Sequence, residues 1–322
     1  MKPFQYVTAR SAAGARELLG DQGAYLAGGN DLLALMKEHI LDPAILVNVK
    51  TLPGLKIIEP GPGKWTIGAG VTVSELEDHA QLKTVFPGLQ QAAAEVGSRQ
   101  IRNVATLGGN LSQHSRCWYF RQRDVVCLKK SGDTCYARHG ENKYHSLFTG
   151  NTCISPVVSN LAVALAALNA VAVVLRQGHE SRLTMAQLYA RAWDNPTAHN
   201  SLEPGDLLTR VEVPLENRRS AYLQISEKAA FDWALVSCAA AGRVQDGTLR
   251  QASVVLGAVA PVPYTSKAAN DFLEGKPLTD ETAAQAADLI LQKARTQSHN
   301  GYKVPIVRTL IRRTLTQLKA QP

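Results

Sequence analysis

Two glycine-containing segments organise this chain: LAGGNDLLALMK at residues 26–37 and QIRNVATLGGNL at residues 100–111. In each, an apolar run leads into paired glycines and then into a stretch with helical spacing. Glycines let a backbone approach a phosphate closely, and the first N–H groups of a helix attract anions. Either pair alone is typical of a tight turn, but two such loops favour one long, phosphate-bearing ligand. Neither loop fits GxGxxG or a P-loop, so a Rossmann nucleotide site is not supported.

The segments around these loops alternate between short helices and strands, and Ser11 is expected to cap a helix that runs to Gly20. A helix is expected at 31–39 and another at 87–99, and a strand at 64–73 is expected to lead into Ser74 as a helix N-cap. Residues 215–219 are polar and turn-like, which places a boundary between a domain at 1–216 and a domain at 217–322. The second domain is expected to hold strands near 221–226, 234–243 and 250–259, and helices near 266–274, 280–297 and 303–319. The 322 residues therefore predict an α+β chain in two parts.

The composition is that of an ordinary globular protein, with 45% hydrophobic and 19% charged residues. The longest apolar runs are too short to span a bilayer, and MKPFQYVTARS carries no secretory signal. These features predict no membrane span and a cytoplasmic location. The formal charge of +8 is concentrated at 116–145 and at 303–319, and the rest of the chain is close to neutral.

Four of the five cysteines lie within 37 residues that overlap the basic segment: Cys117, Cys127, Cys135 and Cys153. Their spacing is neither that of a zinc ribbon nor the compact run of a bacterial ferredoxin. Neighbouring lysines and arginines would offset the negative charge of four thiolates. Scattered buried thiols, disulfides and a zinc site stay open as alternatives.

Other side chains near this cluster have simpler interpretations. The aromatic run at 118–120 is expected to shield the cysteines from water. His114, His139 and His145 are expected to be solvated loop residues rather than ligands. Cys238 lies in the apolar run WALVSCAAA and is expected to be a core side chain.

The two glycine segments resemble the paired FAD-binding segments of the medium, flavoprotein subunits of molybdenum hydroxylases, the family of xanthine dehydrogenase. The similarity continues in GDLLTRVEVP at 205–214, and LGAVAPVPYTS, FLEGKPLTDE and NGYKVPIVRTLIRRTL resemble the C-terminal domain of those subunits. The resemblance implies a two-part FAD-binding domain of the vanillyl-alcohol-oxidase/PCMH-like type with a cysteine-rich insert at 114–155. A smaller α+β domain, a three-stranded sheet with helices, would follow it.

The resemblance also implies which residues hold FAD. The first loop would wrap the pyrophosphate, the second would line the rest of the channel, and Leu208 would pack near the isoalloxazine. Related subunits often carry Asp and Lys where this chain has Asn160 and Gln224, so a charge is absent at the adenosine end and near the flavin. The implied cofactor-binding residues are Leu26, Ala27, Gly28, Gly29, Asn30, Asp31, Leu32, Leu33, Thr106, Gly109, Asn110, Gln113, Asn160, Leu208 and Gln224.

A subset of this family carries an insert of this kind after the second FAD segment, where it ligates one [4Fe-4S] cluster. The type occurs in periplasmic aldehyde oxidoreductase and in 4-hydroxybenzoyl-CoA reductase, and CLKKSGDTC at 127–135 is similar to their inserts. The resemblance therefore implies Cys117, Cys127, Cys135 and Cys153 as metal ligands. It leaves open whether the cluster relays electrons or stabilises the insert.

The function implied is that of an electron-transfer subunit with no catalytic residue of its own. It would sit in a heterotrimer with a small [2Fe-2S] subunit and a large molybdopterin subunit that handles an aldehyde, N-heterocycle or aryl-CoA substrate. Electrons would pass from the [2Fe-2S] centres through FAD to an external acceptor, which is NAD, a quinone, ferredoxin or oxygen. Such a complex can also reach the periplasm through a partner's twin-arginine (Tat) signal.

Two other functions remain as alternatives. The first is a free-standing FAD oxidase of the same flavin-domain superfamily. The second is a four-cysteine zinc-binding nucleic-acid protein, although no RRM, KH or finger-like pattern occurs and no nucleic-acid partner is predicted.

Overall fold

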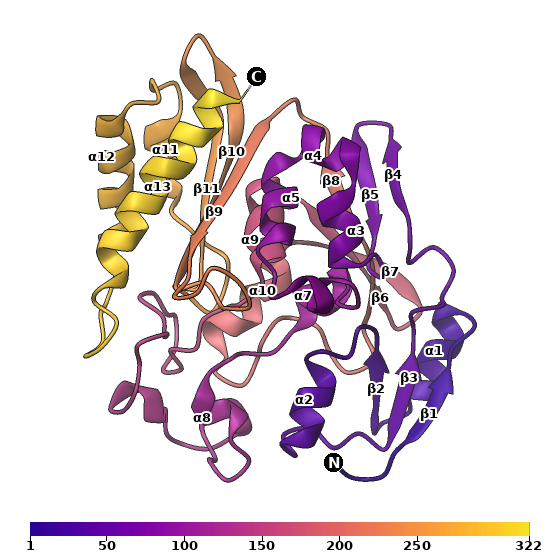
Figure 1. The fold of residues 1–322 in the computed structure, drawn as a ribbon. Helices are drawn as coiled ribbons and strands as arrows, with labels where there is room; N and C mark the ends of the chain where they lie inside the picture. The colour runs from indigo at the N-terminus through magenta and orange to yellow at the C-terminus, as the bar shows by residue number, and fades with distance from the viewer. Residues whose placement is uncertain (322) are drawn as a thin grey trace.

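The computed structural model describes residues 1–321, which form three sheets with helices packed around them (Figure 1). The first sheet is parallel and has the order β1-β3-β2. Ser11 caps the first helix by accepting a hydrogen bond from the Gly14 N–H, as the sequence predicted. The elements of this region are β1 (Gln5–Thr8), α1 (Ala12–Leu19), β2 (Gly23–Leu26), α2 (Leu32–Lys37) and β3 (Ile45–Asn48).

The second sheet is antiparallel, with the order β4-β5-β8-β6-β7 and β8 in its middle. Helix α9 is buried along almost its whole length and contributes to the largest hydrophobic core of the chain. The strands are β4 (Ile58–Gly61), β5 (Lys64–Gly68), β6 (Val171–Arg176), β7 (His179–Thr184) and β8 (Leu207–Pro214). The helices are α3 (Val73–Asp78), α4 (Ala80–Val85), α5 (Pro87–Ala94), α6 (Arg99–Arg102), α7 (Leu107–Ser112), α9 (Asn160–Ala167) and α10 (Met185–Asp194).

The expected strand at 64–73 and its cap at Ser74 were wrong in detail. The strand ends at Gly68, because the backbone there turns against Leu55, whose carbonyl accepts the Gly70 N–H at 2.7 Å. Thr72 is the N-cap of α3, and it forms a capping box with Glu75. Ser74 lies inside that helix, where its hydroxyl donates to the side chain of Asn103.

The third sheet belongs to the C-terminal part of the chain, with the order β12-β11-β10-β9. Its three long strands match the prediction, and the two-residue β12 is added at one edge. Helix α13 packs on one face of this sheet, while α5 and α9 pack on the other (Figure 1). Its elements are β9 (Arg219–Ile225), β10 (Val236–Gln245), β11 (Thr248–Gly257), β12 (Tyr264–Thr265), α11 (Lys267–Leu273), α12 (Asp280–Leu291) and α13 (Lys303–Ala320).

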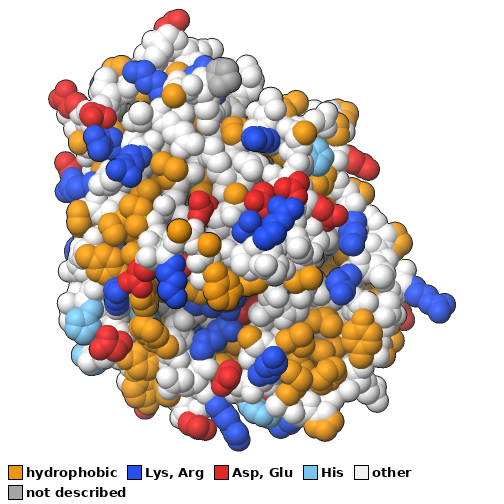
Figure 2. Space-filling view, in the orientation of Figure 1, with side chains coloured by type: hydrophobic (Ala, Val, Ile, Leu, Met, Phe, Trp, Pro, Cys, Tyr) orange, Lys and Arg blue, Asp and Glu red, His pale blue; other side chains and the backbone are white. Residues whose placement is uncertain are grey.

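The structure locates two features of the C-terminal sequence, the lone Cys238 and the basic residues of α13. Cys238 is fully buried on β10, as expected of a core side chain. The basic residues of α13 are partly neutralised by α12, because Arg308 pairs with Asp288 and Arg312 pairs with Asp280. Figure 2 shows this mixture of basic and acidic side chains over much of the visible face.

The segment between α7 and α9 is almost free of regular structure and lies below the C-terminal sheet in Figure 1. It contains α8 (Trp118–Arg121) and two 3-10 turns, η1 (Leu128–Lys130) and η2 (Tyr136–Arg138).

Residues from the start of α13 and the turn before it hold this segment in place. The Asn300 side chain donates to the carbonyls of His145 and Ser146, and the Lys303 ammonium donates to those of Tyr144 and Ala258. Lys303 is fully buried, which lowers its pKa to about 7. Within residues 1–321, no helix has the length and apolarity needed to cross a membrane.

Candidate cofactor site

The first glycine loop joins the end of β2 to the start of α2. Gly29 has a φ of +74°, a conformation that side chains other than glycine rarely adopt. A Cβ atom on Gly28 would lie 2.2 Å from the carbonyl oxygen of Val104, so the two glycine loops touch at this point. Leu26 and Leu33 pack around Gly29 and support the turn.

The second loop leads into α7. The Thr106 hydroxyl caps this helix by accepting the Gly109 N–H at 3.1 Å. Asn110 accepts a hydrogen bond from the Ser159 hydroxyl at 2.6 Å, and Gln113 donates to the Asn110 carbonyl at 2.9 Å. These bonds fix the polar side chains that the sequence assigned to the cofactor channel.

A cavity of about 500 Å³ lies between the two loops and is bordered by both. Its walls are mainly apolar, with polar groups at the glycine loops, as is typical of cofactor sites. The structure therefore fits a long, partly apolar, anionic ligand such as FAD. Ten of the sequence-predicted residues line it: Ala27, Gly28, Gly29, Asn30, Asp31, Leu32, Thr106, Gly109, Asn110 and Gln113.

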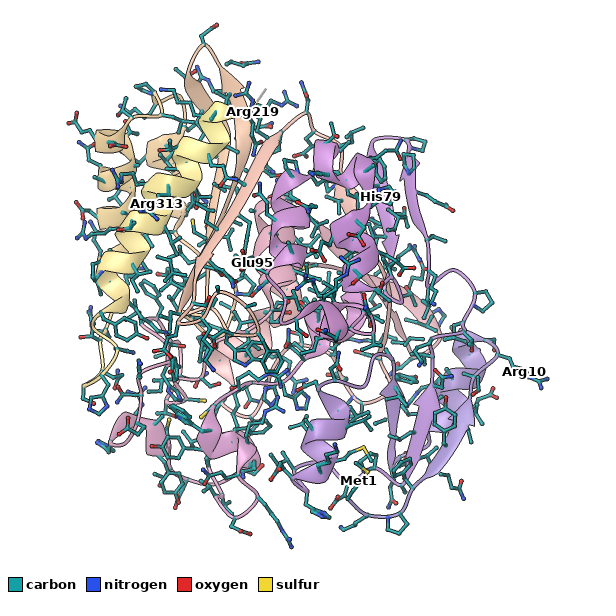
Figure 3. The ribbon with its side chains drawn as sticks, viewed as in Figure 1. Met1, Arg10, His79, Glu95, Arg219 and Arg313 are labelled. Atoms are coloured by element: carbon teal, nitrogen blue, oxygen red, sulfur yellow. The ribbon has the colours of Figure 1, made fainter. Side chains whose placement is uncertain are left out.

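Five predicted residues do not line the cavity: Leu26 and Leu33, which pack beside Gly29, and Asn160, Leu208 and Gln224. Leu208 is buried in the core of the second sheet. The Asn160 side chain donates to Gln224 at 3.0 Å and to the Glu95 carbonyl, so the two amides form a neutral pair where α9 meets β9. Glu95 lies near the centre of the view in Figure 3, and burial raises the pKa of its carboxyl group.

Asp31 bridges the first glycine loop and the cysteine insert. Its carboxylate forms ion pairs with Arg116 and with Arg121, the latter at 2.6 Å, and it accepts the His114 N–H at 2.7 Å. Burial alone would raise the pKa of this carboxyl group, but the two guanidinium groups hold it below its usual value. The carboxylate is therefore charged and paired rather than free to face a phosphate.

The structure adds cavity residues that sequence reasoning missed. Phe231 and Trp233 come from the β9–β10 loop, are 66% and 46% exposed, and line the cavity beside Arg116. The guanidinium of Arg116 lies 4.5 Å from the centre of the Trp233 ring. Two aromatic side chains in the polar stretch SEKAAFDW were the one sequence signal that could have pointed to this loop.

The four clustered cysteines line a second, narrow cavity inside the insert. Backbone N–H groups act to lower the pKa of three of these thiols: those of Tyr119 and Phe120 at Cys117; those of Ala137, Arg138 and Ile154 at Cys135; and that of Ser155 at Cys153. Figure 3 shows sulfur atoms (yellow) in this part of the insert, beside α8. All five cysteines of the chain are free thiols.

The cysteine cavity is buried and contains one cation. The Lys129 ammonium donates to the carbonyls of Pro196 and Ala198, and its pKa is lowered by burial while the four thiols act to raise it. Burial also raises the pKa of Cys117 to about 11. The hydrogen bond between Cys135 and Cys153 lowers the pKa of Cys135 and, with burial, raises that of Cys153.

Two of the three insert histidines are not the solvated loop residues that the sequence predicted. His145 is buried, and its Nε2 lies 3.2 Å from the Cys117 sulfur. His114 stacks on His199 with ring centres 4.1 Å apart. Only His139 is exposed. Of the aromatic run, Tyr119 and Phe120 line the cysteine cavity, whereas Trp118 is exposed.

The donor set of this cavity consists of four free thiols. Among residues 1–321, no three His, Cys, Asp or Glu side chains converge as one metal ion requires. In a [4Fe-4S] cluster each iron takes one cysteine, so the sulfurs surround the cluster instead of meeting at one atom. Four thiols around one cavity, N–H donors to the sulfurs and a buried ammonium fit this group by their chemistry.

The cavity between two glycine loops, followed by a sheet-and-helix domain, defines a class of FAD-binding flavoproteins. Residues 2–216 match the family described as the FAD binding domain in molybdopterin dehydrogenase, and residues 220–318 match the CO dehydrogenase flavoprotein C-terminal domain. The chain belongs to the FAD-binding medium subunits of the molybdenum hydroxylases, an oxidoreductase family, which confirms the resemblance seen in the sequence.

Individual relatives agree with this assignment. The aldehyde oxidoreductase FAD-binding subunit PaoB of Escherichia coli K12 is 31% identical over 329 residues, which cover 100% of both chains. The nicotinate dehydrogenase FAD-subunit of Eubacterium barkeri is 23% identical and covers 100% of this chain and 98% of its own. These matches favour the subunit over the two alternative functions considered from the sequence.

Solved structures share the fold over the whole chain. Quinoline 2-oxidoreductase from Pseudomonas putida 86 has a TM-score of 0.76 at 24% identity and covers 99% of this chain and 98% of its own. Reconstituted CO dehydrogenase from Oligotropha carboxidovorans has a TM-score of 0.78 at 21% identity and covers 100% of both chains. The predicted α+β fold is thereby confirmed.

Proposed function

We propose that this chain is the FAD-holding electron-transfer subunit of a heterotrimeric molybdenum-containing oxidoreductase. Its partners are a small [2Fe-2S] subunit and a large molybdopterin subunit. The observation that carries this proposal is the cavity where both glycine loops meet, in a chain that matches a named FAD-binding subunit over its full length. When bound, FAD supplies two-electron chemistry that can also proceed in single-electron steps.

The residues of this chain bind and orient the cofactor. Gly28 and Gly29 bring backbone close to the diphosphate, and Thr106, Asn110 and Gln113 provide polar contacts along the channel. Leu26 and Leu33 support the turn at Gly29, whereas Leu208 and the Asn160–Gln224 pair do not line the cavity. No acid–base residue of this chain is assigned a catalytic role.

The identity to an aldehyde oxidoreductase subunit favours an aldehyde as the substrate of the large subunit, over an N-heterocycle or an aryl-CoA thioester. The external acceptor is NAD, a quinone, ferredoxin or oxygen, and steady-state turnover with each acceptor distinguishes them. The proposed compartment is the cytoplasm, with export on a partner's Tat signal as the alternative, and cell fractionation of the assembled complex separates the two.

Cys117, Cys127, Cys135 and Cys153 are the proposed ligands of one [4Fe-4S] cluster. Their shared cavity, the N–H donors to their sulfurs and the buried Lys129 support this assignment. Iron and sulfide analysis with low-temperature EPR of the reduced protein tests it. About one zinc per chain without iron would contradict it.

The function itself is tested on the assembled complex. The chain is co-expressed with the products of its neighbouring genes, and the size-exclusion peak is analysed for flavin, molybdenum and iron. We expect FAD to be released on denaturation and three subunits to co-elute. A complex without flavin absorbance and without released FAD would refute the proposal.

A further inference from the structure

The cavity between the two glycine loops, called the flavin cavity from here on, contains one lysine or arginine among the described residues that line it, and that residue is Arg116. His114 also lines the cavity, but burial lowers its pKa to about 4, so its ring is neutral. The diphosphate of FAD is a dianion, and charge-assisted hydrogen bonds from arginine are its strongest protein contacts. Neither glycine loop contributes a lysine or arginine to the cavity wall. The cation comes instead from the cysteine insert.

Arg116 is held by three other cavity residues. Its Nη1 pairs with Asp31, its Nη2 donates to Gln113 at 3.2 Å, and its guanidinium lies over Trp233. These three contacts come from the first glycine loop, the end of α7 and the β9–β10 loop. Its Nε is buried and has no partner, so one donor of the fork is unused in the protein alone.

The charge balance around Asp31 favours an anion in the cavity. An unpaired carboxylate at this loop would repel a diphosphate. Because Arg116 and Arg121 both pair with Asp31, the group carries a net positive charge. Asp31 therefore serves to position a cation at the glycine loop.

The position of Arg116 depends on the conformation of the insert next to the cysteine cavity. Arg116 directly precedes Cys117, whose N–H donates to the Ser115 hydroxyl at 3.0 Å. Arg121 closes the same turn by donating to the Ser115 carbonyl at 2.7 Å. A ligand on the Cys117 sulfur would fix this turn, and with it the guanidinium on the flavin side.

We propose that Arg116 is an FAD-binding residue that couples the two cofactor sites, so that loading the cysteine cavity with iron and sulfide increases the affinity for FAD. This inference rests on the proposed function. By linkage, FAD increases the retention of iron by the same factor. The alternative is that Arg116 only cross-links the insert to the first glycine loop.

The first test measures FAD binding to the full chain freed of flavin, by titration calorimetry, for the wild type, Arg116→Gln and Arg116→Lys. The matched control is Arg123→Gln. Arg123 lies in the same insert, but its side chain is 67% exposed and its ion pair with Asp124 is long, at 3.9 Å. We expect roughly tenfold weaker FAD binding for Arg116→Gln, a smaller loss for Arg116→Lys and no change for Arg123→Gln.

Riboflavin, which lacks the diphosphate, separates charge recognition from a general change of shape. Its affinity should be the same in the wild type and in Arg116→Gln. An equal loss for FAD and riboflavin would show that Arg116 is structural and would overturn the inference. Circular dichroism and the elution volume establish that each variant is folded.

The second test compares iron-loaded and iron-free wild-type protein. We expect tighter FAD binding to the loaded form and no such difference in Arg116→Gln. Equal FAD affinities of loaded and iron-free wild type would overturn the coupling. If the wild type and Arg116→Gln bind FAD equally well, this inference alone is refuted. If the wild type binds no FAD, the proposed function is refuted as well.

Discussion

The flavin cavity and the cysteine cavity are neighbours built in opposite ways. The glycine loops follow β2 and precede α2 and α7, so regular elements fix their backbone before any ligand arrives. The cysteine cavity is lined by α8, two 3-10 turns and irregular chain. A site built on regular elements is largely preformed, whereas a site in irregular chain depends on its ligand for order.

The largest effect expected from this contrast is that of a cysteine ligand. Cys127→Ser should remove all or most of the iron, because the cluster loses one of four ligands, and the insert should become sensitive to protease. Cys238→Ala, which alters the buried thiol on β10, should leave the iron content unchanged. Iron analysis and limited proteolysis of both variants measure this, and full iron in Cys127→Ser would break the contrast.

The next effect concerns the contact between the glycine loops. The Cβ of Gly28→Ala would meet the Val104 carbonyl at 2.2 Å and the Ala105 Cα at 2.9 Å, which are backbone atoms that cannot move aside cheaply. We expect a loss of about 1–3 kcal/mol in unfolding free energy and roughly tenfold weaker FAD binding.

Gly61→Ala on β4 is the matched control for this change, because only one atom, at 3.5 Å, is near its Cβ position. Urea unfolding and FAD titration of the two variants provide the comparison. If Gly28→Ala leaves the unfolding free energy and the FAD affinity unchanged, neither stability nor FAD binding depends on the close approach of the two loops.

A third effect is expected from Lys129, the cation of the cysteine cavity. Lys129→Met removes two hydrogen bonds from a buried ammonium, which corresponds to about 1.5–3 kcal/mol of stability. It should also lower the reduction potential of the cluster, because the more negative reduced state loses a nearby cation. EPR-monitored redox titration measures the potential, and Lys130→Met is the control, since that ammonium reaches only the Gln122 carbonyl. An unchanged potential would place Lys129 in a purely structural role.

The last expected effect is confined to acid pH and concerns the second sheet, β4-β5-β8-β6-β7. Hydrogen bonds and ion pairs with Arg182 and Lys64 lower the pKa of Glu212 on β8 from its ordinary value of 4.5 to about 2. The ionised form contributes roughly 2–3 kcal/mol above pH 4.5, and this contribution is lost as the pH falls toward 2. Glu212→Gln should flatten the pH dependence of unfolding in that window. A wild-type stability that is constant from pH 4.5 to 2 would contradict the assignment.

The same contrast explains how much the sequence could predict. Local signals sufficed for the glycine loops, for the Ser11 cap and for the burial of Cys238, because each depends on near neighbours or on hydrophobic patterning. The cap of α3 was misplaced from Thr72 to Ser74, since both residue types are good caps and only the turn at Gly68 distinguishes them.

The parts of the site that could not be predicted depend on contacts between distant segments. The pairing of Asp31 with Arg116 spans 85 positions, and no pattern in either segment indicates the other. Trp233 reaches the flavin cavity from the β9–β10 loop of the C-terminal sheet. Asn160 and Gln224 look like independent losses of charge in the sequence, but in the structure they are bonded to each other.

The clamp of Asn300 and Lys303 on the insert has a consequence for synthesis. These residues follow their insert partners by 154 to 159 positions. At the usual pace of a ribosome, the insert emerges roughly 8–30 s before the residues that close over it. During that interval the segment around His145, which borders the cysteine cavity, lacks its hydrogen bonds from Asn300 and Lys303. Iron and sulfide delivered during that interval would therefore meet an insert that is held by fewer hydrogen bonds than in the finished fold.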